Sequence, residues 1–144
     1  MIEKNVILFV RGEQQFEQGE PEVTELMTEG AMTLAEDGEI TLTYQETELT
    51  GMEGTTTAFS IRDDTVALTR TGLVNSQMVF QRGRRNSSLY ETPWGVMQVD
   101  VFTNRLVYQL DSRGGVLEIK FSISVDHQAT GENQFKIRVR ESGR

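Results

Sequence analysis

Hydrophobic and polar residues alternate along most of this chain with a period of two. The clearest segment runs from Leu117 to Val125, where apolar side chains occupy every second position and Glu118, Lys120 and two serines lie between them. Because successive side chains of a β-strand point to opposite faces, this pattern predicts strands with one buried and one solvated face. No window shows the 3.6-residue period of a helix over two turns. The sequence therefore predicts an all-β protein.

Polar turns divide the alternating segments into roughly ten strands. The predicted strands are Glu3–Phe16, Glu22–Ala35, Gly38–Glu48, Thr55–Ile61, Thr65–Thr71, Gln77–Arg82, Leu89–Glu91, Met97–Val101, Leu106–Leu110, Leu117–Val125 and Phe135–Val139. Residues 83–88 are expected to form a polar loop, and Asn104 a turn. Gly30 predicts a bulge or a close backbone approach inside its strand.

The connections between these segments are short enough for hairpins, which indicates an antiparallel meander. A long meander closes into a barrel or folds into a sandwich, because both arrangements reduce exposed edges. We favour a single barrel over residues 1–144, with roughly eight to ten strands.

Charge and composition narrow the function classes. The chain has 144 residues, no cysteine and a net charge of −8. Residues 1–53 carry thirteen acids against two bases, whereas the remainder has a small excess of bases. An acidic chain disfavours nonspecific nucleic-acid binding. The short apolar run near the N-terminus predicts neither a signal peptide nor a membrane span, so we expect a cytoplasmic protein.

Several short motifs occur in an order that resembles a known family. The motifs are Glu29-Gly30, Gly38–Glu46, Leu68–Gly72, Thr92-Pro-Trp-Gly95 and Phe102-Thr103. Together they resemble the YwiB-like family of small uncharacterised bacterial proteins, over nearly the whole chain. The resemblance implies a calycin-type, lipocalin-like up-and-down barrel and no activity. The Gly-x-Trp signature of lipocalins is absent near the N-terminus, so a secreted-carrier role is not implied.

Glu46 and Arg70 are the most informative charged residues. Each is in phase with the apolar face of its strand, after Tyr44 and Leu68 respectively. If those faces line the barrel, a carboxylate and a guanidinium point inward and must be paired, because burying an unpaired charge is costly. The pair either anchors the polar end of a ligand in a cavity, with Arg70 binding a carboxylate or phosphate, or is a structural ion pair.

Three aromatic residues complete the candidate ligand-binding set: Tyr44, Trp94 and Tyr108. Trp94 either stacks on a ligand or plugs one end of the barrel. The interior aromatics fit a cavity wall or a packed layer equally well. They are Phe59, Phe80, Tyr44, Tyr108, Phe121 and Phe135.

Catalytic and metal-binding patterns are weak in this sequence. His127 is the only histidine and there is no cysteine, which makes a zinc site improbable by composition. No Gly-x-Ser-x-Gly motif supports a Ser-His-Asp triad. Asp63-Asp64 and Glu36-Asp37 do not follow the spacing of a calcium loop. We therefore predict no cofactor, no metal and no catalytic residues.

These observations leave two main hypotheses about function. The first is a non-catalytic cytoplasmic barrel that binds a small apolar or amphipathic ligand. The second is a protein-interaction or structural module with a fully packed interior, whose acidic first third or exposed edge strand meets a basic partner. An interior void of a few hundred Å³ favours the first, and an exposed apolar patch favours the second. The sequence does not specify the oligomeric state.

Overall fold

Every regular element in the part of the chain that the structure describes is a β-strand. The computed structural model describes residues 1–15, 19–47, 53–72, 75–92 and 95–142. The strands are β1 (Ile2–Gln15), β2 (Glu22–Leu34), β3 (Ile40–Gln45), β4 (Thr55–Arg62), β5 (Thr65–Gly72), β6 (Ser76–Gln81), β7 (Arg85–Thr92), β8 (Gly95–Asp111), β9 (Gly114–Val125) and β10 (Gln128–Glu141). Among these residues no helix is long and apolar enough to cross a membrane.

All ten strands form one antiparallel sheet in the order β6-β5-β4-β3-β2-β1-β10-β9-β8-β7. Consecutive strands pair as hairpins, as the meander prediction requires, except β6 and β7, which lie at the two ends of the sheet. The first and last strands also pair, with registers running from Val6 opposite Glu141 to Gln15 opposite Glu132. The predicted up-and-down arrangement is confirmed.

The two ends of the sheet meet where β6 comes close to β8. Arg82 and Thr103 form an isolated bridge there, and the Gly83 amide donates to the Thr103 carbonyl at 3.0 Å. The Arg82 guanidinium donates two hydrogen bonds, of 3.1 and 2.6 Å, to the Leu106 carbonyl. The barrel is therefore nearly closed at this seam between β6 and β8. There the Arg82 side chain supplies hydrogen bonds that the backbone groups of paired strands supply elsewhere.

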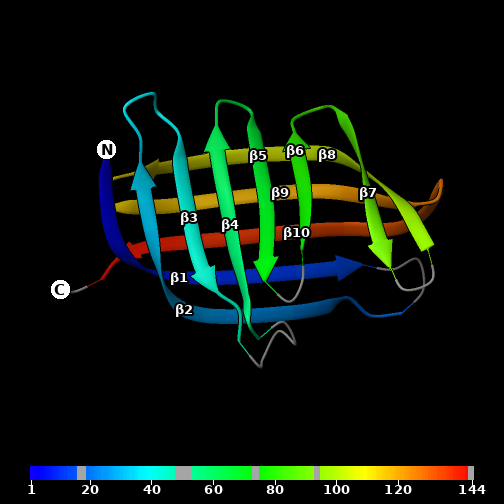
Figure 1. Cartoon of the computed structure of the whole chain (residues 1–144), viewed down its shortest axis with the longest axis horizontal. Coiled ribbons are helices and arrows are strands. Elements are labelled where there is room, and N and C mark those ends of the chain that lie inside the picture. The colour runs from blue at the N-terminus through cyan, green and yellow to red at the C-terminus, as the bar shows by residue number, and fades with distance from the viewer. Residues whose placement is uncertain (16–18, 48–52, 73–74, 93–94, 143–144) are drawn as a thin grey trace.

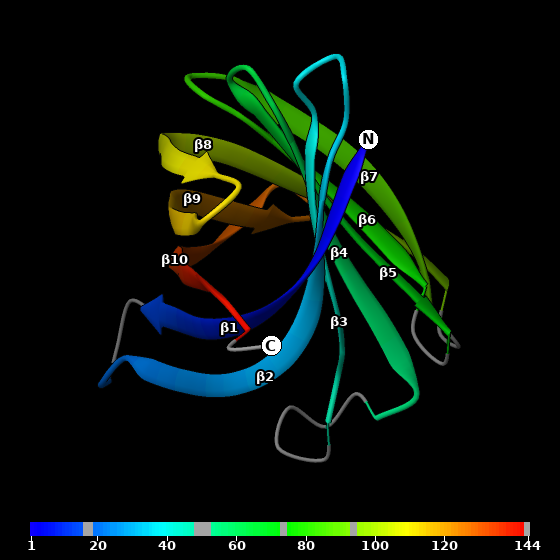
Figure 2. The ribbon, with the colours of Figure 1, turned by 90° about the vertical axis from the view of Figure 1, so that its left-hand side faces the viewer.

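The barrel is flattened into two layers. In Figure 1, β3–β7 lie in front and run across β8, β9, β10 and β1 behind them. Figure 2 shows that β1 and β2 curve from one layer toward the other. β2 pairs with β1 along almost its whole length but with β3 only from Gly30 to Leu34. The second half of β2 therefore forms the corner between the layers.

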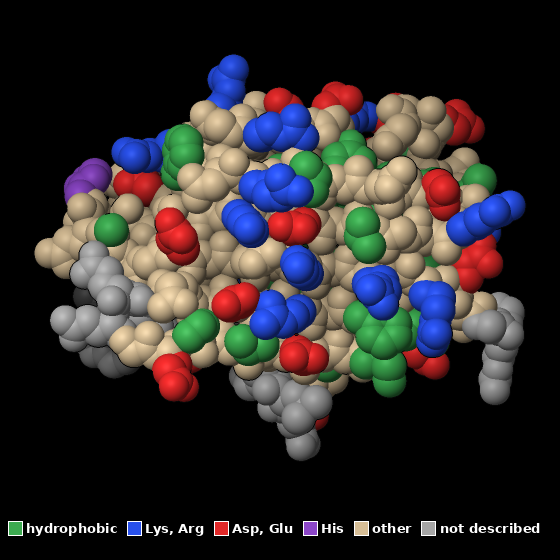
Figure 3. All heavy atoms as spheres, turned by 180° about the vertical axis from the view of Figure 1, so that it is seen from behind, with side chains coloured by type: hydrophobic (Ala, Val, Ile, Leu, Met, Phe, Trp, Pro, Cys, Tyr) green, Lys and Arg blue, Asp and Glu red, His purple; other side chains and the backbone are tan. Residues whose placement is uncertain are grey.

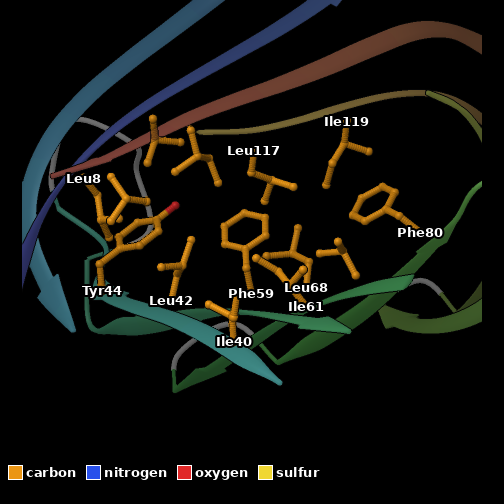
Figure 4. Close-up of a cluster of buried hydrophobic side chains, with 14 of the residues drawn as sticks. Leu8, Ile40, Leu42, Tyr44, Phe59, Ile61, Leu68, Phe80, Leu117 and Ile119 are labelled. Atoms are coloured by element: carbon orange, nitrogen blue, oxygen red, sulfur yellow. The ribbon is translucent and has the colours of Figure 1, made fainter. Parts of the chain in front are cut away.

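The space between the layers is filled by apolar side chains (Figure 4). Alternate residues of the strands are buried, as the period of two predicts. Four phenylalanines pack in the middle, with ring centroids of neighbouring pairs 4.6–6.4 Å apart. They are Phe59, Phe80, Phe121 and Phe135. Most of the interior is therefore packed, in agreement with the expected aromatic layer.

The structure corrects three details of the sequence prediction. Residues 85–88 belong to β7 rather than to a loop. Asn104 does not make a turn, because β8 continues through it with a register shift between Thr103 and Arg105. A β-bulge absorbs one extra residue in this way, and it interrupts the alternation without ending the strand. The alternation along Met97–Val101 puts Asp100 on the face opposite Val99 and Val101, which predicts a solvated side chain, but Asp100 is only 6% exposed.

Gly30 lies at the corner of β2, where another backbone approaches closely. An added Cβ would lie 2.4 Å from the Thr43 carbonyl oxygen and 2.8 Å from Leu8 Cδ1. The register of β2 with β1 continues through Gly30 without a shift, and the pairing of β2 with β3 begins there. Of the two sequence-based alternatives, the close approach is correct and the bulge is wrong.

Gly30→Ala is expected to lower the free energy of unfolding by about 2 kcal/mol, because the added methyl group meets rigid backbone. Gly12→Ala is the matched control, since its Cβ would lie 3.6 Å from the Phe135 ring, an ordinary contact. Urea unfolding of both variants measures the difference. Equal stability of the two variants would contradict the close-approach interpretation.

Candidate functional site

A hollow of about 280 Å³ opens at one end of the barrel, where β1 ends and β2 begins. Its apolar wall is formed by Val10, Leu26, Phe121 and Phe135. Its polar lining comprises Gly12, Glu13, Gln14, Glu22, Thr24, Tyr44, Glu46, Arg70, Asn133 and Gln134. The four-phenylalanine layer bounds the hollow on its inner side, because Phe121 and Phe135 belong to both.

Glu46 is the buried anion of this hollow. It directly follows β3 and continues the inward positions of Leu42 and Tyr44, and its side chain is only 2% exposed. The Thr57 hydroxyl donates a 2.5 Å hydrogen bond to Glu46 Oε2. Arg70 Nε lies 3.9 Å from the same oxygen. The structure therefore brings together the carboxylate and guanidinium that the sequence placed on inward faces.

Tyr44 extends this polar cluster toward the core (Figure 4). Burial raises the pKa of its hydroxyl well above the ordinary value, and the neighbouring Glu46 carboxylate raises this pKa further. The hydroxyl also hydrogen-bonds to Glu46. Tyr44 is therefore a neutral donor at physiological pH, and part of the accepting capacity of Glu46 is already used by Tyr44 and Thr57.

Two nitrogen donors that line the hollow have no acceptor among the described residues. They are Arg70 Nε and Asn133 Nδ2, both hidden from solvent. At 3.9 Å, Arg70 Nε is ion-paired with Glu46 but is beyond hydrogen-bond distance. A buried donor without an acceptor is costly. An acceptor oxygen that reached either donor would satisfy it.

Gly12 creates part of the space. It follows Val6, Leu8 and Val10 at the inward positions of β1, so a side chain here would point into the barrel. Its nearest neighbour is the Phe135 ring. A larger residue at this position would occupy the hollow without touching backbone.

The structure does not gather all the candidate ligand-binding residues. Glu46, Arg70 and Tyr44 line the end hollow, but Tyr108 does not. Tyr108 is half-buried against the core and lines a different hollow, on the outer face of the sheet. Trp94 lies outside the described residues.

His127 lies in the turn between β9 and β10, near the buried carboxylate of Asp100 on β8. Its Nδ1 is 3.8 Å from Asp100 Oδ2, and Ser87 donates a hydrogen bond to the other oxygen of Asp100. The carboxylate therefore stands between the serine and the histidine. A catalytic triad needs the histidine in the middle, so this arrangement does not activate Ser87.

Hydrogen bonds from Ser87 and then Gln98 lower the pKa of Asp100. A lowered pKa in the folded state stabilises the fold above the ordinary carboxyl pKa, and this contribution is lost as pH falls through the lowered value. When the pH is lowered from 6.5 to below about 4, we expect the free energy of unfolding to fall more for the wild-type protein than for Asp100→Asn. Urea unfolding at both pH values tests this, with Glu132→Gln as an exposed control. An equal loss in wild type and Asp100→Asn would contradict the assignment.

No cluster of His, Asp or Glu among the described ranges has the geometry to hold a metal ion. The acidic pairs Asp63-Asp64 and Glu36-Asp37 lie at turns. Asp37 accepts hydrogen bonds from the Glu39 amide and from Arg62, which accounts for it as a turn residue.

The chain is similar to known proteins in both sequence and fold. A family model described as Domain of unknown function (DUF1934) matches residues 9–137. The chain belongs to the DUF1934 family. The fold is similar to that in the crystal structure of the YwiB protein from Bacillus subtilis, with a TM-score of 0.78 and 18% sequence identity over 97% of this chain and 93% of that one. No curated protein matches the sequence.

These comparisons confirm the YwiB-like resemblance and the barrel. At this level of identity, the likeness of a DUF1934 chain to the solved structure shows the fold alone. The finer comparison with calycins and lipocalins stays a prediction.

Among the residues that sequence analysis missed are Gly12 and Asn133 in the lining of the end hollow and Thr57, which hydrogen-bonds to Glu46. Thr57 was recognisable, because it is in phase with Phe59 and Ile61 and was therefore expected to face inward. Gly12 follows three inward apolar residues at the same spacing, so its phase was also readable. Asn133 was readable in the same way, because it precedes Phe135 by two residues and the register of β10 with β9 has no shift after Gly131; it was missed because the predicted strand began at Phe135.

Proposed function

We propose that this protein is a non-catalytic, cytoplasmic barrel that binds a small amphipathic molecule in the end hollow. The supporting observation is a space of about 280 Å³ that has a mainly aromatic and aliphatic inner wall and two donors, Arg70 Nε and Asn133 Nδ2, without acceptors. The size is close to the lower limit of small-molecule sites, so the ligand is of fragment size.

The polar end of the ligand is a hydrogen-bond acceptor. Arg70 Nε and Asn133 Nδ2 both donate, and Tyr44 and Thr57 already direct their hydroxyl groups to Glu46. These donors lose their hydrogen bonds to water when the protein folds, and an acceptor oxygen placed near Arg70 would compensate for that loss.

The charge of the lining favours a neutral acceptor over an anion. Three glutamates line the hollow against one arginine. One of them, Glu13, is paired with Arg11 at 3.0 Å, which leaves Glu22 and Glu46 against Arg70. A carboxylate or phosphate would therefore enter a site with excess negative charge. A carbonyl, amide or alcohol group meets the donors without that repulsion.

Saturation-transfer NMR with a library of neutral fragments tests this proposal. The protein is compared with Gly12→Leu, which fills the hollow, and with Gly12→Ala, which leaves most of it open. We expect carbonyl- or hydroxyl-bearing aromatic fragments to give signals with wild type and Gly12→Ala, and to lose them with Gly12→Leu. Fragments that bind all three proteins alike, or none of them, would contradict a ligand site in this hollow.

A further inference from the structure

A second hollow, of about 950 Å³, lies on the outer face of the back layer. Its lining consists of three consecutive residues from each of five neighbouring strands and includes no residue of β3–β7. The segments are residues 25–27 of β2, 9–11 of β1, 136–138 of β10, 116–118 of β9 and 107–109 of β8. In each triplet the flanking residues point outward and the central one inward, so this hollow lies on the opposite face of the sheet from the ligand site. Val10 and Leu26 lie between the two hollows and line both.

Cations occupy the middle of this surface. Arg11 lies opposite Lys136, and Phe9 lies opposite Arg138, across the β1–β10 ladder. Figure 3 shows Lys and Arg side chains across the centre of this face, with fewer Asp and Glu side chains between them. This concentration contrasts with the net charge of −8 for the whole chain.

Two of these cations have no anionic partner. Within the described part of the chain, no acid lies within ion-pair distance of Lys136 or Arg138. The nearest cross-strand acid to Lys136 is Glu118, whose carboxylate instead contacts Arg105 at 3.3 Å and accepts a hydrogen bond from Gln134. The charges of Lys136 and Arg138 are therefore available to a partner.

Exposed apolar side chains flank the cations on both sides. Met27 pairs across the ladder with Phe9 on one side, and Val116 pairs with Arg138 on the other. Met27 is 67% exposed, Val116 48% and Val107 38%. Exposed apolar groups beside unpaired cations mark an interaction surface for an amphipathic partner.

We propose that this outer face docks an acidic segment of a partner protein, with carboxylates above Lys136 and Arg138 and apolar side chains against Met27 and Val116. Charge complementarity determines the choice of occupant. Five strands at their usual spacing span roughly 19 Å, which accommodates about six residues of extended chain lying across them.

Other occupants fit this face less well. Two copies packed back to back about a two-fold axis through its centre would bring Arg11, Lys136 and Arg138 against their own counterparts. Single-stranded nucleic acid requires aromatic faces for stacking. Phe9 is covered by the Arg140 guanidinium 5.5 Å from its ring centroid, and Tyr108 packs toward the core.

Display selection with a library of random twelve-residue peptides tests the proposal. The intact protein is the bait, and Lys136→Glu/Arg138→Glu is the counter-selected variant. Arg84→Glu/Arg113→Glu is the control, because it makes the same change in charge at two exposed arginines outside this lining. The unfolding midpoint of each variant establishes that its fold is intact.

We expect selected peptides to combine at least two Asp or Glu residues with apolar ones. Their affinity, measured by fluorescence polarisation, should fall about ten-fold or more with the Lys136/Arg138 variant and remain within about two-fold with the control. Met27→Ser should weaken binding independently of charge. Selection of neutral or basic peptides, equal binding to both charge variants, or no enrichment would overturn the proposal. So would a dimer that the Lys136/Arg138 variant dissociates, or oligo(U) binding that the same variant abolishes, because each assigns this face to a different occupant.

Discussion

Phe80→Ala is expected to lower the free energy of unfolding by about 3–5 kcal/mol, the usual cost of truncating a buried aromatic residue. Phe80 is fully buried, and its ring contacts Phe121 and Phe135 at centroid distances of 4.6 and 6.4 Å. The strand that carries it, β6, lies at the seam and pairs with only one regular neighbour, β5. The truncation therefore leaves a cavity at the part of the barrel that has the fewest ladder hydrogen bonds.

Urea unfolding monitored by far-UV circular dichroism measures this loss of stability. Phe102→Ala is the control, because Phe102 is 37% exposed on β8 and its truncation opens no cavity. A Phe80 variant as stable as the Phe102 variant would show that the aromatic layer does not hold the two layers together.

Arg70→Met is expected to destabilise the protein by about 3 kcal/mol, at the lower end of the range for breaking a buried ion pair. The lower end applies because the Arg70 side chain is 22% exposed, whereas Glu46 is only 2% exposed. Without Arg70, the Glu46 carboxylate stays buried with hydrogen bonds from Thr57 and Tyr44 alone.

The double variant Glu46→Met/Arg70→Met should cost less than Arg70→Met alone, because it removes the buried charge together with its partner. A double-mutant cycle by urea unfolding gives the coupling energy of the pair. If Arg70→Met melts like wild type, the buried ion pair contributes nothing, and the structural part of the site assignment is wrong.

The alternation of side chains made the barrel predictable from sequence. It placed Leu42, Tyr44 and Glu46 on the apolar face of one predicted strand, and Leu68 and Arg70 on the apolar face of another. In the structure all five side chains face inward. Such a pattern works because each strand has one buried face and hairpins fix the register of its neighbours. The pairing of β1 with β10 followed from closure of the meander rather than from any local motif.

The pattern failed where one residue changed the phase or where polarity was misleading. The bulge at Asn104 was interpreted as a turn because a single polar residue interrupts the alternation. The alternation placed Asp100 on the face opposite Val99 and Val101, although Ser87 of β7 and Gln98 of β8 satisfy it in a buried position. Periodicity within one strand does not show which side chain of the neighbouring strand lies opposite.

The same limit explains why the sequence could not decide between a cavity and a packed interior. Both exist: phenylalanines fill the middle, and a hollow of about 280 Å³ remains at one end. The hollow depends on Gly12, which has no side chain to fill the space. That space borders the Phe135 ring because β10 places Phe135 opposite Gly12.

Native mass spectrometry of the protein purified from its source organism, without unfolding, tests the ligand-binding claim most directly. Wild type and Gly12→Leu are compared under the same conditions. The account predicts an additional small-molecule mass on wild type that is absent from Gly12→Leu. A bare mass for both proteins, or the same bound mass on both, would contradict the assignment of the end hollow as a ligand site.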